Sequence, residues 1–168
     1  VLPLSIGDGE LCDTALTTVS VPEMFRYWLQ GGRITVGFLG GAQIDRFANL
    51  NTTVVGPYDS PKVRLPGGGG APEIAIHCGE IFITMAMSPR GFVATLPFVT
   101  SLGHGTGPGS REALGVGTKG PTRVITDLCV LEPDPESKEL TVVSLHPVIA
   151  RDRVATACGW PLRFAADL

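Results

Sequence analysis

Short apolar runs alternate with helix signals along the chain, and this alternation predicts an α/β fold. The runs Ile34–Leu39 and Glu80–Met87 are almost wholly apolar, as is typical of strands buried on both faces of a parallel sheet. Three more strands are expected over Asn51–Val55, Thr122–Leu131 and Glu139–Leu145. We therefore expect an open, mostly parallel sheet with flanking helices, formed by a single domain that covers the whole chain.

Three helices are predicted from the signals at their ends. The first begins at Ser20–Glu23, where Ser and Glu have the spacing of a capping box and proline stands in the first turn, and it ends at Gly31-Gly32. Its apolar residues fall on one stripe of the helix surface: Met24, Phe25, Trp28 and Leu29. Two shorter helices, Ala71–Cys78 and Arg151–Cys158, are each closed by a glycine.

The segment Ser88–Lys119 is rich in glycine and has no regular periodicity. It is too long for an ordinary connection, and loops of this kind are usually functional or disordered. The letters of a dinucleotide-binding fingerprint occur over Gly115–Gly120, but Pro121 and a strand follow where that fingerprint requires a helix. We therefore expect no dinucleotide site of that type.

Composition narrows the functions that fit the chain. Charged residues make up 17% of it, and it contains 22 glycines and 14 prolines. Apolar surface combined with many loops favours a subunit that buries one face against a partner, although a large core would give a similar composition. The net charge of −3 and the 13 scattered basic residues argue against a nucleic-acid partner. A membrane partner is not expected either, because no apolar run approaches the ~20 residues of a membrane span.

The cysteines and histidines do not predict a metal site. The four cysteines lack the close spacing of zinc ligands, so we expect buried free thiols in a reducing cytoplasm: Cys12, Cys78, Cys129 and Cys158. The histidines are not spaced as metal ligands, and structural roles are favoured for His77 and His146. His104 lies in the long glycine-rich segment, where a structural role and a ligand contact are both open.

Four consecutive glycines, Gly67–Gly70, stand directly before a predicted helix. Glycine lets the backbone approach a ligand closely, and unpaired backbone amides can hold a negative oxygen. A flexible linker is the alternative, but linkers usually carry serine and polar neighbours, whereas Pro66 and Pro72 fix this segment on both sides. We therefore interpret it as a cradle for an oxyanion or a phosphate.

Short polar side chains follow the first predicted strand, where open α/β sheets place their ligands. They are Gln43, Asp45, Asn49 and Asn51. The alternative is that these side chains hydrogen-bond their own loop, as Asn and Asp often do. The residues alone do not decide between the two.

The chain resembles the β subunits of the family I CoA-transferases, which include the glutaconate and 3-oxoacid enzymes. The resemblance extends over nearly the full length and is most specific in LQGGRITVGFLGGAQIDRFANLNTT followed by PKVRLPGGGGAPEIA. Further matching segments are LPLSIGD, SPR at 88–90, GPTRVITDLCV, SLHP and GWPLR. Where the family more often has Tyr-Gly, this chain has Phe47-Ala48.

The resemblance implies transfer of coenzyme A between an acyl-CoA and a carboxylic acid through a glutamyl-CoA intermediate. It implies Gly69 and Gly70 as the amides that hold the oxyanion. Contacts to the substrate or to CoA are expected from a larger set: Gly67, Gly68, Ala71, Gln43, Asp45, Asn49, Asn51 and His104. No tightly bound cofactor and no metal are expected, because the CoA thioester is itself the substrate.

The resemblance also implies a partner, an α subunit of similar fold in an αβ or α2β2 assembly. The family's nucleophilic glutamate lies in a Glu-Ser-Gly or Glu-Asn-Gly motif shortly before the LPLSIGD segment, and hence upstream of Val1. We therefore expect a chain that is incomplete at its N-terminus. Two alternatives stay open: a CoA-thioester hydrolase or ring-opening enzyme of the same fold, and a non-catalytic partner subunit.

Overall fold

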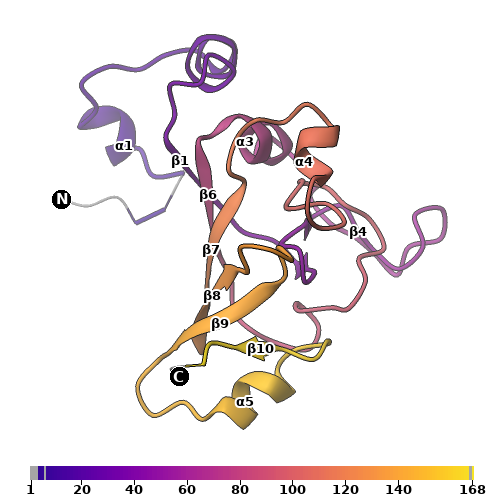
Figure 1. The fold of residues 1–168 in the computed structure, drawn as a ribbon. Helices are drawn as coiled ribbons and strands as arrows, with labels where there is room; N and C mark the ends of the chain where they lie inside the picture. Colours follow the sequence, from indigo (N-terminus) through magenta and orange to yellow (C-terminus); the bar gives the residue numbers. More distant parts are fainter. Residues whose placement is uncertain (1–3, 6, 167) are drawn as a thin grey trace.

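A six-stranded sheet forms the centre of the computed structural model, which describes residues 4–5, 7–166 and 168. Its strands lie side by side in the order of the chain: β1 (Val36–Leu39), β6 (Glu80–Thr84), β7 (Pro121–Ile125), β8 (Cys129–Pro133), β9 (Leu140–Leu145) and β10 (Arg163–Phe164). The pairs β1–β6, β6–β7 and β9–β10 are parallel, and the pairs β7–β8 and β8–β9 are antiparallel. The predicted open, mostly parallel α/β sheet is confirmed, with few helices around it (Figure 1).

The helix α3 (Ala71–His77) packs on β1 at a point where the strand has no side chain. A Cβ at Gly37 would lie 2.7 Å from Ile74 Cγ2 and 2.8 Å from Cys78 Sγ. Only glycine therefore lets helix and strand approach this closely. Because the glycine loop leads directly into α3, this contact also fixes the loop against the sheet.

The N-terminal helix begins where the sequence predicts. The Ser20 hydroxyl accepts a hydrogen bond from the Glu23 amide, and α2 (Val21–Glu23) runs directly into the π-helix η1 (Met24–Leu29). Leu29 is buried and Phe25 half-buried, whereas Met24 and Trp28 are each 38% exposed. The predicted apolar stripe is therefore only partly covered. A short helix, α1 (Glu10–Asp13), lies before it, and Leu2, Pro3 and Ile6 of the LPLSIGD segment are outside the described residues.

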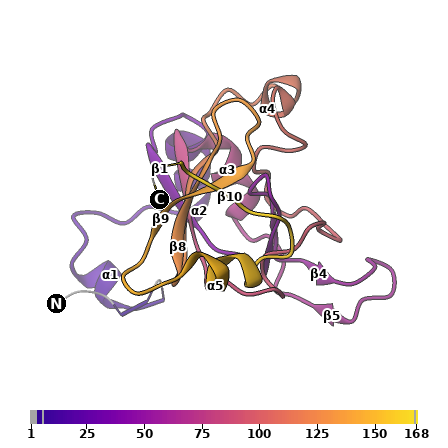
Figure 2. The same ribbon diagram turned by 60° about the horizontal axis from the view of Figure 1, so that its bottom comes forward.

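The prediction of one strand over Asn51–Val55 is wrong. The segment contributes to two small sheets, β2 (Gln43–Ile44) with β3 (Leu50–Asn51), and β4 (Val54–Val55) with β5 (Val63–Arg64). The Asn51 side-chain oxygen accepts hydrogen bonds from the amides of Thr53 and Val54, which turns the chain between β3 and β4. The β4–β5 hairpin projects away from the rest of the molecule (Figure 2).

The predicted strand Thr122–Leu131 is also wrong, because the chain turns back within it to form the β7–β8 hairpin. The Thr126 hydroxyl accepts from the amides of Leu128 and Cys129 at this turn. The strand β6 ends at Thr84, before its predicted end at Met87. The Met87 amide instead donates to the Asp127 carboxylate. The Thr126 hydrogen bonds are local and compete with the strand ladder, whereas the bond between Met87 and Asp127 joins residues 40 positions apart.

Two further helices lie in the second half of the chain, and both differ from the prediction. The first, α4 (Ser110–Ala113), lies inside the segment predicted to be irregular. The second, α5 (Arg151–Thr156), ends two residues before the predicted Cys158.

The four cysteines, all in the described part of the chain, are free thiols, with Cys78 and Cys129 buried, Cys158 half-buried and Cys12 exposed. Burial raises the pKa of Cys158 to about 11. Among the described residues, no three His, Cys, Asp or Glu side chains gather as metal ligands would. None of the described helices has the length and apolar character needed to cross a membrane.

Candidate active site

The glycine loop keeps most of its backbone amides available. Gly67 and Gly69 have φ angles of +95° and +49°, which side-chain-bearing residues adopt at a cost. The Gly67 amide donates to the Thr52 carbonyl at 2.8 Å, and the Ala71 amide donates to the Gly68 carbonyl at 2.9 Å. Within the part of the chain that the structure describes, the amides of Gly68, Gly69 and Gly70 donate to no acceptor. The loop therefore offers unpaired N–H groups beside β3 and β4, as an oxyanion cradle requires.

Two side chains limit the space around this loop. A Cβ at Gly70 would lie 2.5 Å from Cζ of the Phe25 ring, so η1 covers this end of the loop. A Cβ at Gly68 would lie 3.2 Å from Thr100 Cγ2. The Thr100 hydroxyl in turn accepts from the Thr52 amide at 2.9 Å and lies 2.8 Å from the Thr53 hydroxyl. Neither Phe25 nor Thr100 was among the residues proposed from the sequence.

Gln43 and Asn51 lie beside the glycine loop and contact each other. The Asn51 amide nitrogen donates to Gln43 Oε1 at 2.9 Å and to the Val54 carbonyl at 2.6 Å. Asn51 is fully buried, and its oxygen is bound by two backbone amides as described above. Its role in this structure is to fix the backbone to which the loop attaches. Gln43 is half-buried, and its Nε2 makes only a 3.5 Å contact with the Arg90 carbonyl.

Asp45 and Asn49 brace a tight turn. Asp45 accepts from the backbone amides of Phe47 and Asn49 and from the Asn49 side chain, at 2.9 to 3.0 Å. The Asn49 oxygen accepts from the amides of Gly103 and Gly105, so it joins this turn to the long glycine-rich segment. Burial raises the pKa of the Asp45 carboxyl, against the opposing effect of the Asn49 hydrogen bonds. The sequence allowed either a ligand contact or hydrogen bonds within the loop for Asp45 and Asn49, and the contacts in the structure are of the second kind.

His104 lies on the far side of this turn, in a separate hollow. Its amide donates to the Phe47 carbonyl, and its ring Nε2 is 2.8 Å from the Pro121 carbonyl. Burial lowers the pKa of His104, and the hydrogen bond to Pro121 opposes this shift only in part. The structure therefore divides the predicted residues: Gln43, Asn51 and the loop Gly67–Ala71 lie together, whereas Asp45, Asn49 and His104 form a second network.

An apolar cavity of about 370 Å³ lies beside the Asp45–Asn49 turn. Its wall is made chiefly of Phe47, Leu96, Val99 and Leu102. Val99 and Leu102 belong to the same segment as Thr100, whose hydroxyl contacts the Thr52 amide next to the glycine loop. A mainly apolar hollow with few polar groups is typical of a site for a small organic ligand.

Backbone amides without acceptors and an apolar hollow are together typical of a site for a small anionic ligand. A family model described as "Coenzyme A transferase" matches residues 1–157. The chain therefore belongs to the coenzyme A transferase family.

Two relatives are similar over most of this chain. One subunit of the 3-oxoadipate CoA-transferase from Pseudomonas knackmussii is 59% identical over 168 residues, which is 100% of this chain and 65% of the relative. The crystal structure of glutaconate CoA-transferase from Acidaminococcus fermentans superposes with a TM-score of 0.87 at 32% identity, covering 96% of this chain and 64% of that one. The chain thus spans about two thirds of the length of these relatives.

A third relative has a different activity in its name. The cholesterol ring-cleaving hydrolase IpdB subunit of Mycobacterium tuberculosis is 26% identical over 167 residues, which is 92% of this chain and 66% of the relative. The chain is therefore similar both to proteins named as transferases and to a protein named as a hydrolase subunit.

Proposed function

We propose that this chain is part of a CoA-transferase subunit that moves coenzyme A between an acyl-CoA and a carboxylic acid of the 3-oxoacid or dicarboxylate type. The observation that carries the proposal is the run of unpaired amides at Gly68–Gly70 in a chain 59% identical to a 3-oxoadipate CoA-transferase subunit. The 26% identity to the hydrolase subunit is much weaker support for ring cleavage.

The proposed reaction runs through a nucleophilic glutamate of the full-length enzyme. Its carboxylate attacks the acyl-CoA thioester carbonyl and expels CoA thiolate, which gives a mixed anhydride. The thiolate then attacks the glutamyl carbonyl and releases the first acid, which leaves a glutamyl-CoA thioester. An incoming carboxylate reverses both steps and leaves with the CoA. Each attack forms a tetrahedral oxyanion, and we assign the amides of Gly69 and Gly70 to hold it.

The remaining predicted residues take three roles in this proposal. The loop residues Gly67, Gly68 and Ala71, and Gln43, which contacts Asn51 next to the loop's partner Thr52, would line the acyl and glutamate side of the site. Asn51 acts through the backbone that it positions, since it is fully buried. Asp45 and Asn49 shape the wall of the apolar cavity. The coenzyme enters as a substrate thioester, with no cofactor held between turnovers.

The proposal includes a second subunit of similar fold, in an αβ or α2β2 assembly. Its support is the subunit name of the 59% identical relative and the exposed apolar residues of η1 and β1, among them Tyr27 and Phe38 at 63% and 66% exposure. We place the complex in the cytoplasm, which fits the free thiols of the four cysteines.

The reaction class is tested with the full-length protein and whatever subunit co-purifies with it. The complex is incubated with an acyl-CoA and then with borohydride, which reduces a glutamyl-CoA thioester and should abolish activity. Full survival of activity would contradict the covalent intermediate. Release of free CoA without an acceptor acid would point to a hydrolase, and absence of CoA-thioester binding would indicate a non-catalytic subunit.

The oxyanion role is tested with a matched pair at Gly70. In a Phe25→Ala background, which makes room for a Cβ, Gly70→Ala keeps the backbone N–H and Gly70→Pro removes it. The φ of Gly70 is −87°, close to the proline range. Loss of one oxyanion donor typically lowers kcat by ~10²–10³-fold, and we expect that difference between the two variants. Equal kcat values would remove the Gly70 amide from the mechanism.

A further inference from the structure

A second hollow, at the start of β7, carries a surplus of positive charge. It has a volume of about 370 Å³, and its wall includes Arg111, Lys119 and Lys138 against one carboxylate, Glu112. With His104 neutral, three positive charges and one negative charge leave a net charge of +2. Within the described residues, no carboxylate oxygen lies within 4.0 Å of these three cations.

Arg111 is the fixed part of this wall. It is only 4% exposed, and its guanidinium donates to the carbonyls of Gly103, Ala75 and Thr118 and to the Thr118 hydroxyl, at 2.7 to 3.2 Å. Carbonyl groups satisfy N–H donors but do not neutralise the charge. A buried cation without a counter-ion is costly, so a site of this kind favours a bound anion.

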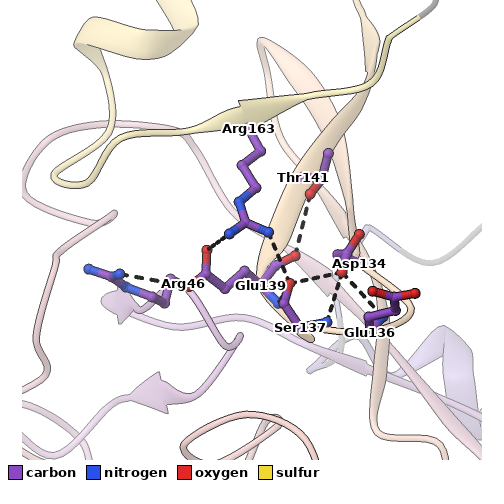
Figure 3. Close-up of polar contacts among 7 residues, drawn as sticks. All are labelled: Arg46, Asp134, Glu136, Ser137, Glu139, Thr141 and Arg163. Atoms are coloured by element: carbon purple, nitrogen blue, oxygen red, sulfur yellow. Dashed lines mark hydrogen bonds and ion pairs between the residues drawn. The ribbon is translucent and has the colours of Figure 1, made fainter.

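Lys138 is held at the cavity by the β8–β9 turn. Asp134 Oδ1 accepts from the amides of Glu136 and Ser137 and from the Ser137 hydroxyl (Figure 3). The Lys138 amide donates to the Asp134 carbonyl. The turn places Lys138 at a φ of +62°, an unfavourable conformation for a residue other than glycine. Strain of this kind persists where the surrounding structure imposes it and often marks functional sites.

Two carboxylates of the same turn, those of Glu139 and Asp134, are engaged with groups other than Lys138. Glu139 contacts Arg163 at 3.5 Å and Arg46 at 3.9 Å, and Arg163 also donates to the Ser137 hydroxyl (Figure 3). The Asp134 carboxylate accepts hydrogen bonds from groups of the turn itself. Lys138 has no carboxylate oxygen within 4.0 Å in the described structure, although three acidic residues, Asp134, Glu136 and Glu139, stand within four positions of it.

We propose that this cavity binds a phosphate group, with the Arg111 guanidinium as its floor and Lys119 and Lys138 at its rim. A phosphate dianion matches the surplus charge of +2 and fits easily within the cavity volume. The phosphate can belong to coenzyme A or to a free phosphate ester, and the proposal does not depend on transferase activity. It gives a function to the glycine-rich segment, whose residues Gly107, Gly109 and Gly117 complete the wall.

The test measures equilibrium binding of inorganic phosphate to the full-length protein, with any co-purifying subunit, by isothermal titration calorimetry at low salt. Lys138→Gly removes the charge and suits the positive φ, so this variant should fold; Lys119→Gln removes the second charge. We expect the double variant to bind phosphate at least tenfold more weakly. Lys62→Gln, which removes an exposed lysine near the β4–β5 hairpin, is the control and should bind as the wild type does.

The source of the phosphate is distinguished by comparing coenzyme A with dephospho-coenzyme A. If the 3′-phosphate of coenzyme A occupies the cavity, the double variant weakens binding of coenzyme A but leaves binding of dephospho-coenzyme A unchanged. If neither coenzyme is affected while inorganic phosphate is, the ligand is a free phosphate ester. Absence of saturable phosphate binding to the wild type, or equal affinities of wild type and double variant, would overturn the proposal.

Discussion

The two glycine-rich segments of this protein use the same residue in opposite ways. In Gly67–Gly70, three successive amides stay without acceptors in the described structure, and a Cβ at Gly69 would meet no atom within 4 Å. In the segment Gly103–Gly120, Gly103, Gly105 and Gly120 lie tightly against other groups. A Cβ at Gly103 would be 2.3 Å from the Ala48 backbone, and one at Gly120 would be 2.9 Å from the Arg111 guanidinium.

The difference lies in what occupies the space that glycine leaves. At Gly67 and Gly69 that space is open, so the chain there can take a positive φ and leave neighbouring backbone donors exposed to a ligand. At Gly103 and Gly120 it is filled by the turn that Asn49 braces and by Arg111, so glycine permits close packing. A count of glycines does not separate these roles, but substitutions at matched positions do.

The largest effect is expected from removing Arg111. Arg111→Met leaves three carbonyls and the Thr118 hydroxyl without their donor, and each unsatisfied buried group costs about 1–3 kcal/mol. Because water in the adjacent cavity can replace some of these bonds, we expect a loss of about 4 kcal/mol in the free energy of unfolding. Urea denaturation measures it.

Arg153→Met is the control for that experiment, because Arg153 is exposed on α5. Such surface changes usually stay within about 0.5 kcal/mol. If the Arg111 and Arg153 variants unfolded at the same urea concentration, the second glycine-rich segment would not depend on Arg111, and the contrast with the first would be lost.

Asn49→Ala should have the next largest effect. It removes the acceptor for the Gly103 and Gly105 amides and the donor to Asp45, and we expect a loss of about 3 kcal/mol. Thr95→Ala, an exposed change near the apolar cavity, should be nearly neutral. A small loss of stability in the Asn49 variant would favour the other role that the sequence allowed, a contact of Asn49 with the ligand.

Much of the fold could be predicted because its signals are local. The apolar runs marked β1, β6 and β9, and the Ser20 and Pro22 pattern marked the start of the first helix. The strand predictions failed where a side chain captures backbone amides two or three residues away, as at Asn51 and Thr126. Apolar composition alone cannot show such a hydrogen bond.

The candidate site could be predicted in part, for a related reason. Glycine runs and the clustered polar residues 43–51 are visible in the sequence, and the chain folds them together through the contact of Gly67 with Thr52. Arg111 gave no local signal, since its partners Ala75 and Gly103 lie 36 and 8 positions away. Phe25 and Thr100 also contact the glycine loop from segments that are far from it in the sequence. Their roles depend on the tertiary fold.

A matched pair of glycine substitutions gives a smaller but more direct test of the contrast. Gly69 and Gly120 both have positive φ, at +49° and +72°. Gly69→Ala adds only backbone strain, about 1 kcal/mol, because the space beside it is open. Gly120→Ala adds the same strain and a collision with Arg111, and overpacking of this type costs about 1–3 kcal/mol more. Equal losses of unfolding free energy would contradict the assignment of open and filled space.

The smallest effect is expected in the pH dependence of stability that comes from His104, a residue of the second glycine-rich segment. Burial, together with the nearby charges of Arg111 and Lys138, holds the pKa of His104 below its ordinary value, against the opposing effects of the Pro121 hydrogen bond and Glu112. Above about pH 6.5, the ordinary pKa of histidine, the ring is neutral in both states and contributes no slope. Below that pH the unfolded chain takes up a proton that the folded protein does not, so stability falls as pH drops toward the folded pKa.

His104→Gln keeps a donor for the Pro121 carbonyl without titrating. The loss of unfolding free energy between pH 7.0 and 5.5, measured by urea denaturation, should therefore be smaller in the variant than in the wild type. Identical losses would mean that the folded protein protonates His104 as freely as the unfolded chain does, contrary to the effect of burial and of the Arg111 and Lys138 charges.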